Sequence, residues 1–209
     1  MEKKYKLTEE SISFNGRTLY RIESLRDFGL IKKGQKGGFI ESEYNLSHEG
    51  DSWVYDDAKV YDNAEVCGNA RVLDNAKVSG NAMVSDNAWV FGNAMVFDNA
   101  KVSGNAKVSD NAWVFGNANV SGKALVSGNA KVSGNANVCA DEDYIVFKNW
   151  WGSGRHFTWT RSNNMWKVGC FYGTGEELIK NAYKDSEKSG REYERVVKYV
   201  ESILADEKK

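Results

Sequence analysis

Proline is absent from this 209-residue chain, and cysteine and histidine are rare, with three and two copies. The missing proline excludes collagen-like and polyproline structures, which depend on it. It also fits a backbone whose N–H groups are mostly committed to hydrogen-bond ladders, because proline has no N–H to donate. The cysteines contain no Cys-x-x-Cys pair, so neither a zinc site nor a disulfide framework is indicated. We expect free thiols and no bound metal or cofactor.

Long apolar runs and a strong net charge are also lacking. No stretch approaches eighteen consecutive apolar residues, and no apolar segment follows the charged start of the chain, which excludes a predicted transmembrane helix or secretory signal. The formal net charge is −1, so no overall field favours nucleic acid or an anionic membrane. We therefore expect a soluble, cytoplasmic protein whose partners include neither membranes nor nucleic acids.

One six-residue phrase, V-x-[G/D]-N-A-x, fills the middle of the chain. Val recurs fifteen times at a spacing of six between Val54 and Val138, and only Asp57 and Lys123 break the column of Asn that precedes each Ala. The segment A-x-V-x alternates as a half-buried strand requires, while Gly, Asp and Asn favour a sharp corner. A helix is excluded, because a six-residue spacing gives no continuous apolar stripe at 3.6 residues per turn.

This phrase resembles the hexapeptide repeat of left-handed parallel β-helices, and most closely the YdcK-type β-solenoid repeat proteins that are common in bacterial and prophage genomes. The resemblance implies a triangular turn of eighteen residues and left-handed winding. Val and Ala would then fill the interior, and Cys67 and Cys139 would lie four turns apart, beyond disulfide reach. Side-chain amide ladders are expected along the Asn columns, for example at Asn63, Asn81, Asn99, Asn117 and Asn135.

The fold class expected is mainly β, with a small element at each end of a β-helix over residues 40–140. Residues 1–39 should form an N-terminal hairpin and cap, because Asn15-Gly16 is a strong hairpin signal and an open solenoid end must be covered. The six-residue spacing already appears at Ile40 and Leu46 and then slips by two, which predicts a loop over residues 47–50 in an irregular first turn.

Residues 141–209 should form a small C-terminal α+β module. Three aromatic-rich strands are expected over 144–150, 155–160 and 165–171, followed by two helices. Thr174 and Ser189 each stand three residues before a Glu, the spacing of a helix capping box. The second helix would carry one apolar face that needs a partner, formed by Tyr193, Val196, Val197, Val200, Ile203 and Leu204.

Outward-facing positions of the solenoid contain one predicted interaction patch that wraps a corner at mid-solenoid. Soluble monomers rarely expose so large an aromatic surface. The patch could join subunits of a homo-oligomer, such as a dimer or trimer, receive the C-terminal helices, or bind an unknown host protein. Its six residues are Trp89, Phe91, Met95, Phe97, Trp113 and Phe115.

Enzyme and scaffold interpretations compete. Well-known left-handed β-helices are acyltransferases with a His base, yet here His48 and His156 both lie outside the regular turns. We therefore expect no catalytic residues and interpret the chain as a non-catalytic β-solenoid scaffold that acts through protein interaction. By resemblance it would be phage or prophage derived, and it could inhibit or sequester a host defence factor.

The alternative is an acyl or nucleotidyl transferase, or a protein that binds a small ligand such as a nucleotide. One cluster of aromatic and polar residues could hold such a ligand by stacking and charge, although these aromatics could equally form the core of the C-terminal strands. The cluster comprises Trp150, Trp151, Arg155, His156 and Trp159.

Overall fold

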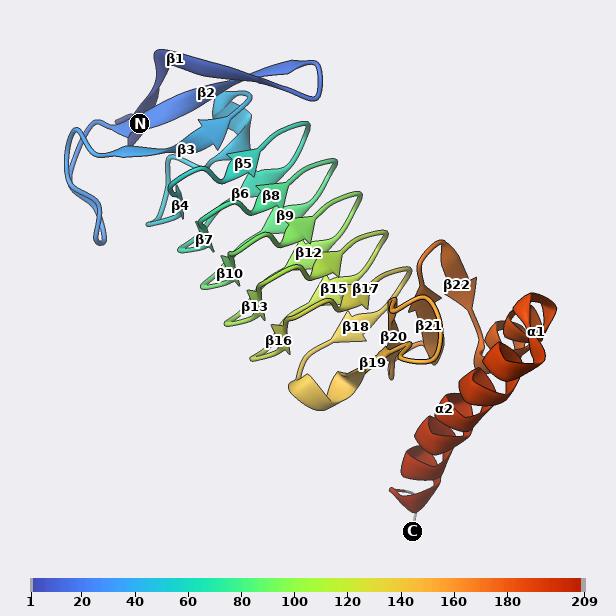
Figure 1. Ribbon diagram of the computed structural model, residues 1–209. Coiled ribbons are helices and arrows are strands. Elements are labelled where there is room, and N and C mark those ends of the chain that lie inside the picture. The colour runs from blue at the N-terminus through green and yellow to red at the C-terminus, as the bar shows by residue number, and fades with distance from the viewer. Residues whose placement is uncertain (1, 208–209) are drawn as a thin grey trace. The chain divides into compact units, whose positions relative to one another are not determined.

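A computed structural model describes residues 2–207 of the protein and divides the chain into two compact units. The first unit ends at Asp143 and the second begins at Tyr144. The first contains the N-terminal hairpin together with the repeats, and the second contains a small antiparallel sheet and two helices (Figure 1).

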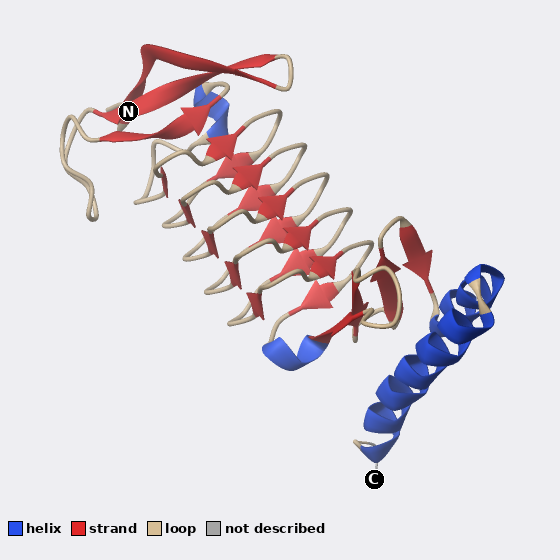
Figure 2. Cartoon of the chain, viewed as in Figure 1, coloured by secondary structure: helices blue, strands red, loops and turns tan. Residues whose placement is uncertain are grey.

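The first unit is a parallel β-solenoid of two-residue strands joined by tight corners (Figure 2). Its strands form three sheets, which are called the first, second and third sheet below. The first sheet holds β5 (Lys59–Val60), β8 (Lys77–Val78), β11 (Met95–Val96), β14 (Trp113–Val114) and β17 (Lys131–Val132). The second holds β4 (Trp53–Val54), β7 (Arg71–Val72), β10 (Trp89–Val90), β13 (Lys107–Val108) and β16 (Leu125–Val126). The third holds β6 (Glu65–Val66), β9 (Met83–Val84), β12 (Lys101–Val102), β15 (Asn119–Val120) and β18 (Asn137–Val138).

Each strand pairs with the strand eighteen residues later, so the predicted turn length is confirmed. Trp89 lies opposite Lys107, and Met95 lies opposite Trp113. The backbone ladder is regular: the Trp89 N–H donates to Ala106 at 3.0 Å, and the Phe91 N–H donates to Val108 at 2.9 Å. This register places identical side chains above one another, which accounts for a sequence that repeats almost without change.

The interior of the solenoid consists of the stacked Val and Ala columns. Every Val from Val54 to Val138 is fully buried, and every Ala from Ala58 to Ala136 is at most 1% exposed. Val suits these positions because its β-branched side chain is stiff and packs well on the strand surface. Burial of these columns is the main favourable term in the folding of this unit.

The corners are held by two kinds of polar ladder. The predicted Asn ladder is present, with side-chain amides linked at 3.0 to 3.3 Å from Asn63 through Asn81, Asn99 and Asn117 to Asn135. A second ladder was not expected: Asp74 adopts a positive φ of 56° and its carboxylate accepts the Gly92 N–H of the next turn at 2.8 Å. The same contact recurs at four further corners, from Asp62 to Gly80, Asp86 to Gly104, Asp98 to Gly116 and Asp110 to Gly128.

The N-terminal hairpin pairs with the first turn of the solenoid. Strands β1 (Tyr5–Phe14) and β2 (Arg17–Ser24) meet at Asn15-Gly16, where both residues have positive φ, as predicted. Strand β3 (Lys36–Ile40) is antiparallel to β2 and parallel to β5, so the hairpin continues the first sheet. Ile40 and Leu46 lie opposite Val60 and Val66, which confirms the irregular first turn and brings the solenoid to six turns.

Lys4 of the hairpin is fully buried against the loop of this first turn. Its ammonium group donates to the Ser52 carbonyl at 2.9 Å and to the Gly50 carbonyl at 3.3 Å, and it lies 5.1 Å from the centre of the Phe28 ring. Desolvation lowers the pKa of Lys4 from 10.5 to about 8, although the Asp51 carboxylate opposes this shift.

The second unit is a four-stranded antiparallel sheet followed by two helices. Its strands are β19 (Tyr144–Lys148), β20 (His156–Thr160), β21 (Met165–Val168) and β22 (Phe171–Gly173). The prediction of one strand over 165–171 was wrong, because Gly169, with a φ of 55°, turns the chain and separates two strands.

Both helices have side-chain caps, but the predicted start of the second was wrong. Helix α1 (Gly175–Asp185) begins after Thr174 with the expected capping box. Helix α2 (Glu187–Asp206) is capped by Ser186, whose hydroxyl accepts the Ser189 N–H at 3.1 Å. Ser189 therefore lies in the first turn. A short link between the helices and the lack of a side chain at Gly190, which faces Tyr183, allow this earlier start.

We expect the replacement Val96→Asp to lower the free energy of unfolding by about 3 kcal/mol or more, because it buries a carboxylate with no partner. The matched control is Lys101→Glu on the third sheet, where the side chain is exposed and the change should stay within about 0.5 kcal/mol. Urea denaturation monitored by circular dichroism measures both. Equal losses in the two variants would contradict the assignment of inward and outward positions.

We expect the burial of Lys4 to make the free energy of unfolding depend on pH between about 8 and 10.5. Because the pKa is about 8 in the folded state and 10.5 when unperturbed, the unfolded chain holds an extra proton between these values. The free energy of unfolding should therefore rise from pH 8 to pH 10.5 more steeply in the wild type than in Lys4→Met. Lys33→Met, at an exposed position, serves as the control and should keep the wild-type slope. Parallel slopes for wild type and Lys4→Met would disprove the shift.

Candidate functional site

Three aromatic rings meet on the outer face of the first sheet. Phe97 follows β11, while Trp113 and Phe115 belong to the next turn of the same sheet. The rings of Phe97 and Phe115 are stacked with centroids 4.9 Å apart, and Trp113 packs edge-on against Phe97 at 5.9 Å. The eighteen-residue register brings these side chains together, so Phe97 and Trp113 share one face as predicted. We call these three residues the three-ring cluster.

Trp89 occupies the adjacent second sheet, one corner before Met95. It has a cation on each side along the ladder, with the Arg71 guanidinium 5.0 Å and the Lys107 ammonium 5.4 Å from its ring. Trp113 has a similar neighbour, because the Lys131 ammonium lies 4.1 Å from its ring. Both indole rings of the predicted patch thus have basic groups packed against them.

All six residues of the predicted patch are half-buried. Their neighbours in the ladder cover part of each side chain, so the patch offers less free apolar area than isolated outward residues would. The outward strand positions around them contain only basic charged residues on the first two sheets, and no Asp or Glu stands there between residues 53 and 133. These basic residues are Lys59, Arg71, Lys77, Lys107 and Lys131.

The apolar face of α2 has a partner within its own unit. Tyr193, Val197 and Val200 are buried in one core cluster with Phe157, Trp159 and Trp166 of the small sheet. This packing supplies the apolar partner that the sequence predicts α2 to need.

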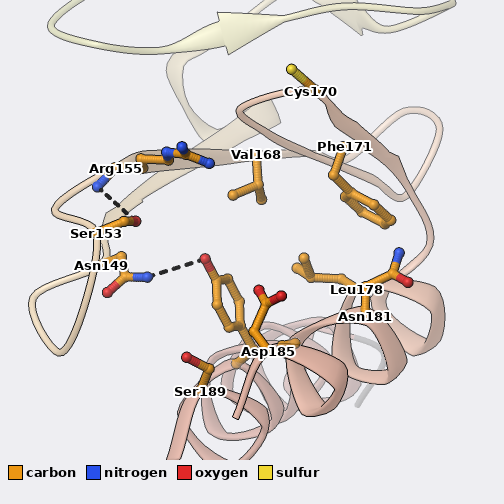
Figure 3. Close-up of a pocket in the computed structure, with 12 residues that line it drawn as sticks. Asn149, Ser153, Arg155, Val168, Cys170, Phe171, Leu178, Asn181, Asp185 and Ser189 are labelled. Carbon is orange, nitrogen blue, oxygen red and sulfur yellow. Dashed lines mark hydrogen bonds between the residues drawn. The ribbon is translucent and has the colours of Figure 1, made fainter.

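A cavity of about 380 Å³ opens in the second unit between the sheet and the helices (Figure 3). Its apolar lining consists of Val168, Phe171, Leu178 and Ala182. Its polar lining includes Asn149, Ser153, Arg155, Asp185, Ser189 and Tyr193. Figure 3 shows Arg155 on the loop side and Asp185 on the helix side of the open space.

The predicted ligand cluster is divided by the structure. Trp159 is buried in the core of the sheet, and its indole N–H donates to Asn164 at 2.8 Å. Trp151 packs on the same core, whereas Trp150 is 76% exposed. Of the five residues, Arg155 alone lines the cavity, and His156 lies on β20 opposite Lys148.

Sequence reasoning missed the other polar residues of this cavity. Asn149 directly follows β19, Asp185 ends α1, and Tyr193 lies inside α2, so no local spacing connects them. The sequence pattern places Tyr193 only on the apolar face of its helix. Its hydroxyl was the available signal of a polar neighbour, because a buried phenol usually has a hydrogen-bond partner.

The two histidines are held by contacts of the fold. His48 accepts the Lys4 backbone N–H at Nδ1, and its ring stacks on Tyr5 with centroids 4.4 Å apart. His156 is part of the β19–β20 ladder. Neither lies on the regular turns that carry the patch.

The cysteines are free, as expected, with Cys139 and Cys170 exposed and Cys67 half-buried. Burial raises the pKa of the Cys67 thiol, which makes its reactive thiolate rarer. Within residues 2–207, no group of three or more His, Cys, Asp or Glu side chains is placed to hold a metal ion. Neither α1 nor α2 combines the length and apolar character that membrane crossing requires.

Residues 76–92 match the family model of the YdcK Beta solenoid repeat. The matched segment runs from Ala76 to Gly92 and includes β8, β9 and β10, so it ends at the corner between Trp89 and Met95. The predicted resemblance to this type of repeat is therefore confirmed for these residues. No curated protein matches the chain.

Proposed function

We propose that the solenoid is a rigid, non-catalytic platform that binds an acidic surface of another protein through its aromatic patch. The observation that carries this proposal is the combination of the three-ring cluster with basic residues alone around it on the first two sheets. Aromatic and basic side chains are enriched at protein interfaces, where aromatic residues often supply much of the binding energy.

Charge argues for a partner of opposite sign. A two-fold contact of the patch with its own copy would bring the same five basic residues of each copy to one interface, and like charges oppose such pairing. Acidic residues of the solenoid lie at the corners instead, where carboxylates such as that of Asp74 accept backbone N–H groups. The strand positions of the first two sheets are therefore basic, while the exposed carboxylates of Asp74 and Asp110 stand at the corner between these sheets. An acidic partner would be attracted by the strand positions.

The ring contacts argue for protein over nucleic acid. Base stacking needs a free aromatic face, but Arg71 and Lys107 lie over the two sides of Trp89, and Lys131 lies over Trp113. Carboxylates can approach these cations without displacing them from the rings. A host defence factor is one partner of this class, which would agree with a phage-derived role.

The non-catalytic part of the proposal rests on the two histidines. His48 is engaged with Lys4 and Tyr5, and His156 lies in a strand of the other unit. No histidine on the regular turns is available as a base for acyl transfer, the chemistry that the resemblance to left-handed β-helices raised.

We expect a photo-crosslinking residue in place of Phe115 to capture a protein in the cells that produce this chain. The same residue in place of Met83, which is 37% exposed on the third sheet, is the matched control and should capture nothing above background. The captured contact should be rich in Asp and Glu. Reversing the charge at Lys107 and Lys131 together should lower the yield at least tenfold, because it replaces attraction by repulsion.

The double variant Phe97→Ser and Trp113→Ser should abolish capture as well, while Met83→Ser with Asn119→Ser should not. Thermal unfolding shows whether both pairs remain folded, and the charge-reversal variant tests the proposal without altering the rings. Light scattering supplies the opposing outcome. If the wild type is a dimer or trimer that the Phe97 and Trp113 variant converts to a monomer, the occupant is a second copy and the acidic-partner proposal is wrong.

We expect no turnover of acetyl-coenzyme A with amine or amino-sugar acceptors, because neither histidine is placed as a base beside the patch. A coupled thiol-release assay on wild type, His48→Gln and His156→Gln measures this. Acetylation that either histidine variant abolishes would show that the platform is an enzyme.

A further inference from the structure

We infer that the cavity of the C-terminal unit binds a small zwitterion, an α-amino acid with an apolar side chain. The inference concerns residues 144–207 and is independent of the role proposed for the solenoid. Three features carry it: opposed charges at the mouth of the cavity, a buried hydroxyl with a free proton, and an apolar floor.

The mouth of the cavity carries one positive and one negative group, Arg155 and Asp185. In Figure 3 they lie on opposite sides of the open space, and neither side chain has a hydrogen-bond or ion-pair partner among residues 2–207. Arg155 is placed by its backbone, since its carbonyl accepts the Asn149 N–H at 2.8 Å. Its guanidinium also lies against Gly169, where a Cβ atom would come within 3.3 Å of it. A ligand with a carboxylate and an ammonium group would complement both charges.

Tyr193 supplies a buried donor beside these charges. The residue is 7% exposed, and its hydroxyl oxygen accepts the Asn149 side-chain N–H at 3.3 Å. The hydroxyl therefore keeps its own proton for another acceptor, since one oxygen can accept and donate at the same time. Asn149 is 4% exposed, so this pair is fixed inside the unit and not on its surface. A ligand carboxylate could accept from Tyr193 and Arg155 together.

The floor of the cavity is apolar. Leu178 and Ala182 of α1 are each 4% exposed, Val168 of β21 is 9% exposed, and Phe171 is half-buried beside them. A volume of about 380 Å³ lies at the small end of ligand pockets. A branched or aromatic side chain could fill this floor while its charged head stays at the mouth, which selects an apolar amino acid over a sugar or a nucleotide.

Isothermal titration calorimetry of the full chain tests the inference with L-leucine and L-phenylalanine as probes. Two leucine analogues separate the charges: 4-methylpentanoate lacks the amino group and isoamylamine lacks the carboxylate. Wild type should bind at least one amino acid, and for leucine each analogue should bind about tenfold to a hundredfold more weakly, because each loses a charged hydrogen-bonding group.

Variants assign each charge to its partner. Arg155→Gln should weaken leucine binding at least tenfold yet bind isoamylamine as the wild type does, since that probe has no carboxylate. Asp185→Asn should weaken leucine binding similarly and leave 4-methylpentanoate unchanged. Tyr193→Phe should weaken both carboxylate probes. The matched controls are Arg191→Gln and Glu201→Gln, exposed positions on α2 that should bind leucine as the wild type does.

The inference fails if wild type binds neither amino acid at about 10 mM, a concentration at which even a weak pocket would be occupied. It fails equally if the analogues bind as tightly as leucine, or if the control variants lose as much affinity as Arg155→Gln. Failure here would leave the solenoid proposal untouched, because the patch and the cavity share no residue.

Discussion

The eighteen-residue stacking register is the constraint on which the first unit depends. It aligns the backbone N–H groups of the strands with carbonyls of the next turn and places Val on Val and Ala on Ala inside. The same register stacks the outward side chains, so one column can hold a ring beneath a ring, as for Phe97 and Phe115. Interior stability and exterior chemistry are therefore set by one repeat distance.

Polar groups at the corners reinforce this register and do not merely terminate the strands. The Asn amides join one turn to the next, and Asp carboxylates such as that of Asp74 reach the N–H of the following corner. A neutral hydrogen bond contributes about 1 kcal/mol, and one to a charged group more. Because these bonds are repeated along the axis, a shift of one turn against its neighbour would break many of them together.

The solenoid could be predicted because its information is local and repeated. A residue such as Val96 is buried for the same reason as its equivalents in every turn, and the Asn15-Gly16 turn is an equally local signal. The C-terminal unit was less predictable. Ser186 and Ser189 are both acceptable caps by residue type, and the choice between them depends on packing between the helices at Gly190. The cavity needs Asn149, Asp185 and Tyr193 together, which only the tertiary fold achieves.

The three-sided turn has a consequence for how such a chain can change in length. Six residues inserted between Phe97 and Trp113 would preserve the alternation of every strand, yet they would move all following outward residues on to the next face of the solenoid. Trp113 and Phe115 would then leave the face of Phe97 and stand above a different column. Eighteen inserted residues would instead add one complete turn and leave each face in line. Insertion of any six-residue repeat would therefore keep the core intact. Only insertion of eighteen residues would also keep each column of outward side chains on its own face.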